Sequence, residues 1–114
     1  MYPQNDCLES DWKLFRKRIP VWQERYMGRL MEEYRAILDS EKLPSEKFWA
    51  LEKQIRQDKK SPGVIVDMRR STMRLELIQM LFQGVIQFGD LEGLSQELRD
   101  RIISWYEHCQ QTVT

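Results

Sequence analysis

Histidine and cysteine are scarce in this chain of 114 residues, which has one histidine and two cysteines. A metal site needs several His, Cys, Asp or Glu side chains that converge. His108 and Cys109 are neighbours, and adjacent side chains of a helix point apart. A catalytic triad built on histidine would also depend on His108, in the last turn of a helix. The sequence therefore predicts no metal ligands and no catalytic residues.

Motifs for nucleotide and ester chemistry are also missing from the sequence. The chain contains no P-loop, no G-x-G-x-x-G and no G-x-S-x-G. Neighbouring acidic residues such as Glu32 and Glu33 are typical of a solvated helix surface. We therefore predict that the protein is not an enzyme, uses no cofactor and takes no small-molecule substrate.

The chain has no excess of charge of either sign and no long apolar run. Lys plus Arg and Asp plus Glu number 18 each, which argues against a polyanion-binding arm and against an acidic DNA mimic. No uncharged apolar segment reaches the ~18–20 residues that span a bilayer, and the N-terminus lacks a signal-peptide core. Cys7 and Cys109 lie far apart without a C-x-x-C partner, which favours free thiols in a reducing cytosol. We expect a cytoplasmic protein that does not bind membranes.

Apolar residues at helical spacing are what the sequence does contain. From the cap candidates Ser10 and Asp11 onward they recur every three or four residues along one face. These residues are Trp12, Phe15, Ile19, Trp22, Tyr26, Leu30, Tyr34 and Ile37. Because the stripe keeps its phase across Pro20, we predict one helix over about 11–39 with a kink near Pro20. Two helices separated at Pro20 are the alternative.

The stretch 61–84 is the most apolar part of the chain and predicts a central helix over 62–83. Ser61 can cap this helix, Pro62 suits its first position, and Gly84 suits the residue after its last turn. One predicted face consists of Val64, Met68, Ser71, Leu75, Ile78 and Phe82, and it is widened by Leu77, Met80 and Leu81. A helix that is apolar over so much of its surface needs neighbours on several sides.

Two further helices complete the predicted fold. Ser45 can cap a helix over about 45–60, with Phe48, Leu51 and Ile55 on one side. After a short turn at 90–93, Ser95 can cap a last helix over about 95–109. We predict an all-α, single-domain bundle of four main helices over 11–109, with disordered tails at 1–10 and 110–114. The first and third helices should form the main contact, and the last should close the core.

A cluster of basic residues surrounds the predicted short turn between the second and third helices. It consists of Arg56, Lys59, Lys60, Arg69, Arg70 and Arg74. Two helices joined by a tight turn, with arginines early in the second, are typical of a DNA recognition helix. Cations at helix ends are also stabilising by themselves. This cluster is therefore a candidate patch for nucleic acid or for a protein partner.

Aromatic residues are abundant, with four Trp and four Tyr. At helical spacing most of them should belong to the core, and we expect Trp22, Trp49 and Trp105 to be partly buried. Trp12, near a helix end, is the candidate for an exposed interface anchor. The absence of catalytic motifs favours a non-catalytic protein that binds a protein partner, or itself as a homo-oligomer, through a helical surface. A nucleic-acid-binding regulator is the alternative.

Three segments of the chain resemble a family of short, all-helical bacterial proteins with no established activity. The segments are DWKLFRKRIPVWQERYMGRLMEEY, SEKFWALEKQIRQDKKSPGV and FQGVIQFGDLEGLSQELRDRI, between Asp11 and Ile103. Members of this family occur in genomes and mobile elements of gut anaerobes. The resemblance implies an intracellular bacterial setting. It adds a further alternative function, inhibition of a host defence system by a mobile-element or phage protein.

Overall fold

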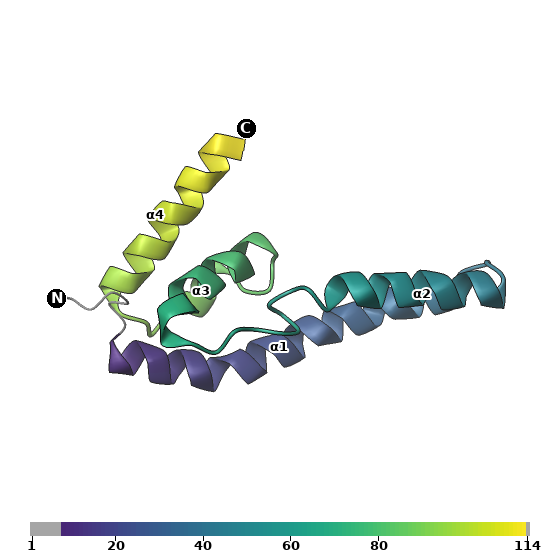
Figure 1. Ribbon diagram of the computed structural model, residues 1–114, viewed down its shortest axis with the longest axis horizontal. Coiled ribbons are helices and arrows are strands. Elements are labelled where there is room, and N and C mark those ends of the chain that lie inside the picture. The colour runs from purple at the N-terminus through teal and green to yellow at the C-terminus, as the bar shows by residue number, and fades with distance from the viewer. Residues whose placement is uncertain (1–7, 114) are drawn as a thin grey trace.

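The computed structural model describes residues 8–113, and within them it contains helices and no strand (Figure 1). The elements are α1 (Glu9–Leu38), α2 (Pro44–Asp58), α3 (Met73–Phe82), α4 (Gln96–Val113) and the 3-10 turns η1 (Arg70–Thr72) and η2 (Phe88–Leu91). The predicted all-α class is confirmed. None of the helices in residues 8–113 combines the length and hydrophobicity of a membrane span.

Helix α1 has 30 residues and is therefore about 45 Å long. It continues through Pro20, which excludes the alternative of two separate helices. Trp12, Phe15, Ile19 and Trp22 on its predicted apolar face are all buried. Packing of this stripe compensates for the hydrogen bond that proline removes.

The core lies beside the first half of α1, where α3, α4 and the segment between them cover its apolar face. The side chains that α3 and the following residues contribute are Met73, Leu77, Ile78, Met80, Leu81, Val85, Ile86, Leu91, Leu94, Leu98 and Ile102. The closest backbone packing joins α3 to α4 and α1 to α2. The prediction that α1 and α3 form the main contact is therefore wrong, although their buried side chains share this core.

The prediction of a central helix over 62–83 is wrong for its first half, because residues 64–69 have no helical structure. Val64, Ile65 and Val66 are β-branched and favour extended backbone. Ser61 Oγ accepts a hydrogen bond from the Gly63 N–H, at 3.0 Å, and this local turn competes with a helix start. The connection to α3 is therefore long, whereas a very short turn was predicted.

The predicted apolar face of the central helix is confirmed only in part. Leu77, Ile78, Met80 and Leu81 are buried as predicted, but Leu75 is 53% and Phe82 is 41% exposed. Met73, which was not assigned to this face, is buried. The predicted phase was set by Val64 and Met68, which do not belong to the helix.

The predicted end of this helix is confirmed at Gly84. This glycine has φ 73°, and its N–H and that of Val85 donate to the carbonyls of Leu81 and Met80. That double hydrogen-bond pattern is a Schellman motif, which favours glycine at its left-handed position.

The second half of α1 and α2 form a two-helix arm, residues 24–58, that projects from the core (Figure 1). Tyr34 on α1 donates to Asp58 Oδ2 at 2.7 Å, and Lys47 Nζ donates to the Leu38 carbonyl at 2.7 Å. Helix α2 has no buried residue. The arm makes the molecule 59 Å long with a radius of gyration of 17.0 Å, against about 13 Å for a compact domain of this length.

Helix α4 begins after Ser95, whose Oγ accepts the Leu98 N–H as predicted for a cap. The helix extends to Val113, so the predicted disordered tail is wrong for residues 110–113. Trp22 is buried, but Trp105 is 54% and Trp49 is 64% exposed, more than predicted. The other predicted tail starts in residues 1–7, which include Cys7 and lie outside the described residues.

Candidate partner-binding groove

The beginnings of α1, α3 and α4 meet at one end of the core. Asp11 on α1 is buried and accepts hydrogen bonds from the Ser95 N–H at 2.8 Å and the Ser95 hydroxyl at 2.7 Å. Arg70, just before α3, lies 2.7 Å from the Glu9 carboxylate. These contacts fix the N-termini of the three helices relative to each other, and α3 and α4 extend away from this junction side by side.

A row of arginines on α1 holds the segment between α3 and α4 in place. Arg18 donates to the carbonyls of Asp90 and Glu92, Arg25 to that of Val85, and Arg29 to that of Gly84. Arg25 also forms an ion pair with Asp90 at 2.8 Å. Burial opposes ionisation of Asp90, but hydrogen bonds from Arg25 and the Gln87 N–H outweigh it and hold its pKa below the usual range. The two helices that this segment connects are thereby fixed in position.

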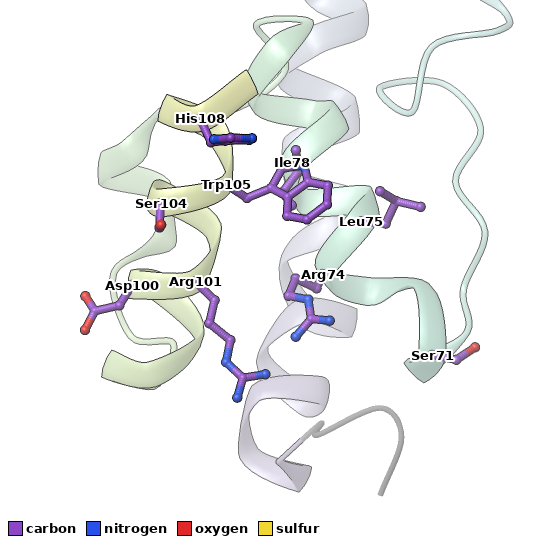
Figure 2. Close-up of a pocket in the computed structure, with 9 residues that line it drawn as sticks. All are labelled: Ser71, Arg74, Leu75, Ile78, Asp100, Arg101, Ser104, Trp105 and His108. Carbon is purple, nitrogen blue, oxygen red and sulfur yellow. The ribbon is translucent and has the colours of Figure 1, made fainter. Parts of the chain in front are cut away.

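Between α3 and α4 lies an open groove with a volume of about 790 Å³. It is lined by Ser71, Arg74, Leu75, Ile78, Asp100, Arg101, Ser104, Trp105 and His108. Figure 2 shows the Trp105 ring extending from α4 toward Leu75 and Ile78 on α3, while Asp100 points away from the groove. Arg74 and Arg101 come from opposite walls, and their guanidinium groups lie at the same end of the groove.

The groove therefore combines an apolar surface with concentrated positive charge. Ile78 is buried at its base, and the walls offer the half-exposed side chains of Leu75 and Trp105. Arg101 also pairs with Glu97, one turn earlier on α4, at 3.2 Å, and 43% of its side chain is exposed. An elongated apolar surface with cations at one end fits an amphipathic helix that carries acidic residues.

The predicted basic cluster does not form one patch, because the extended segment carries its two halves to different places. Gly63, shortly after α2, lies against the Tyr26 ring of α1, because a Cβ at this position would be 2.2 Å from the ring. Near the start of α3, Arg70 contacts Glu9. Seventeen residues of α1 separate Tyr26 from Glu9, which corresponds to about 25 Å of helix. Lys59 and Lys60 are therefore far from Arg70 and Arg74.

Three arginines of that cluster also have acidic partners. Arg56 pairs with Glu52, Arg69 with Asp67 and Arg70 with Glu9. The hydrogen bond from Arg69 outweighs burial and lowers the pKa of the Asp67 carboxyl. Of the six predicted residues, Arg74 lies in the groove, and Lys59 lies beside Arg56 on an apolar strip of α2.

The prediction of Trp12 as an exposed anchor is wrong. Trp12 is only 7% exposed, packs on Phe15 with ring centroids 5.8 Å apart, and is covered by the Arg70 guanidinium at 5.6 Å. Trp105 and Arg101, which line the groove, were not singled out as an exposed pair. Their i, i+4 spacing places them on one side of α4 and was a usable signal.

The residues that the structure describes contain no group of three or more His, Cys, Asp or Glu side chains placed to hold a metal ion. Comparisons with known proteins find no matching family model, no matching curated protein and no matching solved structure. The resemblance to short bacterial proteins thus stays a prediction. Functional inference depends on the geometry of the groove and on the surfaces around it.

Proposed function

We propose that this protein is a non-catalytic binding protein whose α3–α4 groove holds an acidic, amphipathic helix of a protein partner. The observation that supports this proposal is the position of Trp105 and Leu75, large apolar side chains about half exposed on facing walls. Such side chains in a concave surface are typical of the anchor pockets of protein interfaces.

The charged end of the groove determines the class of partner. Arg74 and Arg101 present guanidinium groups next to the apolar walls, and Asp100 points outward. A carboxylate placed between these arginines gains charge-assisted hydrogen bonds. A cationic helix would lose this gain and would be repelled, so the groove selects acidic over basic sequences.

Nucleic acid remains the alternative occupant, and the structure gives it less support. A phosphate-binding surface needs several cations along one face, whereas the predicted cluster is divided between two places and three of its arginines are paired with acids. An apolar wall of Leu75 and Trp105 also offers little to a phosphate backbone.

A peptide titration tests the proposal. The probe is a fluorescent amphipathic helix of Leu, Phe and Glu, compared with the same helix carrying Lys in place of Glu. We expect the acidic helix to bind at least tenfold more tightly, and Arg74→Glu and Leu75→Asp each to weaken it about tenfold or more. Lys13→Glu and Ile65→Asp are the matched controls, because both residues are exposed outside the groove.

Three results would contradict the proposal. They are no binding of either peptide, equal binding of both, or equal losses in the groove and control variants. A duplex DNA or a single-stranded RNA of mixed sequence serves as the competing probe. Binding to it that weakens steeply with salt and depends on Arg74 would favour the nucleic-acid alternative.

A further inference from the structure

The arm carries large apolar side chains that no other part of residues 8–113 covers. Met31 is 50% exposed, Leu38 51%, Phe48 62% and Ile55 37%. A helix pair in a globular domain normally turns such side chains toward a core. These side chains lie outside the α3–α4 groove, so they are independent of the proposed function.

The apolar stripes of the two arm helices lie on the same side of the arm. On α1, Leu30 and Ile37 face α2. The stripe of Met27, Met31 and Leu38 is rotated from them by roughly 80° about the helix axis, in the direction in which the helix turns from its N- to its C-terminus. On α2, the half-buried Ala50 and Gln54 face α1. The stripe of Phe48, Leu51 and Ile55 is offset from them in the same winding direction.

Because α1 and α2 run antiparallel, equal offsets in the winding direction place both stripes on one side of the pair. We call this side the arm face, and it comprises Met27, Met31, Leu38, Phe48, Leu51 and Ile55. The opposite side of the arm is lined by Lys42, Lys53 and Gln57 beside Tyr26 and Ile37, and the exposed Trp49 of α2 lies outside the arm face. The exposed apolar stripes of both helices are therefore together on one side of the arm.

We infer that the arm face is a dimer interface, which a second copy of this chain covers to make an antiparallel four-helix bundle. Two helices with apolar residues on one shared side form half of such a bundle. The exposed apolar area of the arm face is on the order of 500 Å², at the upper end of patches on monomers. With its charged edges it can supply the roughly 800 Å² per partner of a stable interface.

Charges at the edges of the arm face favour a copy of the same chain, turned end to end. On α1, Glu24 and Arg35 lie on one edge about three turns apart, and both are exposed. On the α2 edge, Glu52 and Lys59 lie about two turns apart and line the same apolar strip. A two-fold axis across the arm places each acid opposite the base of the second copy.

Gly28 also lies on this part of α1, and beyond its chain neighbours and the backbone of its own helix no atom lies within 4 Å of the position that a Cβ would take there. A small residue at this position leaves room for a side chain of the second copy, such as Met31.

Sedimentation equilibrium over a wide concentration range tests the inference. The mass should rise from 13.9 kDa toward twice that value with increasing concentration. Met31→Glu combined with Phe48→Glu should stay at 13.9 kDa. Val21→Glu is the matched control, because Val21 is 63% exposed on another side of α1, and it should dimerise like the wild type.

Charge reversal tests the antiparallel arrangement with two exposed residues of α1, of which Arg35 also pairs with Glu32 in the same helix at 3.5 Å. Glu24→Lys alone should weaken dimerisation about tenfold, since it converts two attractive pairs into two repulsive ones. Adding Arg35→Glu should restore the affinity, because each reversed residue again faces an opposite charge. A single 13.9 kDa species at all concentrations, or failure of the second reversal to restore affinity, would overturn the inference.

Discussion

The two halves of α1 have apolar residues at the same helical spacing and very different surroundings. In the first half, Trp12, Phe15, Ile19 and Trp22 are all buried, because α3, α4 and the segment between them cover that side. In the second half, Leu30 is the only buried residue, because α2 is its principal neighbour. The difference shows that an apolar stripe defines a helix face, whereas the number of elements packed on that face decides burial.

The contacts that attach each region to α1 differ in the same way. The core is joined by buried apolar packing and by arginine hydrogen bonds to backbone carbonyls, while the arm is joined by side-chain bonds such as that between Tyr34 and Asp58. Regions with few buried apolar contacts open at lower free energy than the core. We therefore expect the core to determine global stability and the arm to open locally.

The largest expected effect comes from removing a ring in the core and comparing it with the same change in the arm. Phe15 has no exposed surface, so Phe15→Ala loses both apolar burial and packing, and it should lower the free energy of unfolding by about 3–5 kcal/mol. Phe48→Ala, at 62% exposure, should change it by less than about 0.5 kcal/mol in the monomer. Guanidinium denaturation at low protein concentration measures both values.

Similar losses for the two phenylalanines would remove the distinction between core and arm. Circular dichroism of each variant before denaturation is the control. A variant of Phe15 that does not fold at all agrees with the prediction, because the expected loss approaches the total stability of a small domain.

The next largest effect concerns Asp11, whose buried carboxylate accepts two hydrogen bonds from Ser95. Asp11→Ala leaves the Ser95 N–H and hydroxyl without their acceptor, and it should cost about 1.5–3 kcal/mol. Glu9→Ala, which removes a largely exposed partner of Arg70, is the control and should cost less than about 1 kcal/mol. Denaturation of both variants under the same conditions is the measurement, and equal costs would contradict the prediction.

Local sequence patterns predicted most of the helices but only part of the candidate site. Stripe phase was sufficient for α1, α2 and α4, because that signal acts within one element. Of the predicted caps only Ser95 is confirmed, since Leu8 and Leu43 precede α1 and α2, and Ser10, Asp11 and Ser45 lie inside those helices. Both signals failed over 62–72, where the β-branched run from Val64 to Val66 and a turn at Ser61 prevailed over helical spacing. The residues of the basic cluster are close in sequence, but the extended segment places its two halves beside different parts of α1. The cluster is therefore divided between two places.

The groove could not be predicted because it depends on how α3 and α4 are oriented. Trp105 and Leu75 were each assigned to an apolar line, and both are about half exposed, because they lie on the sides of the two helices that face the groove. Such exposure depends on contacts between elements far apart in sequence, such as Asp11 with Ser95 and Arg18 with Asp90.

Replacing a glycine by alanine should lower the free energy of unfolding at one position in the core and raise it at one position in the arm. Gly84 ends α3 with φ 73°, so Gly84→Ala should destabilise the core by about 1–2 kcal/mol. Gly28 lies within α1 with open space around it, so Gly28→Ala should stabilise the monomer by up to about 1 kcal/mol. Thermal denaturation of the two variants at low concentration measures the difference, and shifts of the same sign would contradict it.

The smallest expected effects are pH-dependent, and they also differ between the regions. The fold lowers the pKa of Asp90 through Arg25 and Gln87, so its contribution to stability is complete above its ordinary pKa of about 4 and is lost as pH falls below that. Burial and the hydrogen bond to Asp58 raise the pKa of Tyr34, so its contribution is complete below about pH 10 and is lost as pH rises further.

Acid should therefore weaken the core segment that Asp90 holds, and alkali should weaken the arm. Asp90→Asn should be less stable than the wild type at neutral pH by up to about 1 kcal/mol, and this difference should disappear toward pH ~2. Tyr34→Phe should show its difference at neutral pH and lose it in strong alkali. Denaturation free energies across the pH range measure both, with each variant as the control for the other. Loss of the Tyr34 contribution in acid and not in alkali would contradict this prediction.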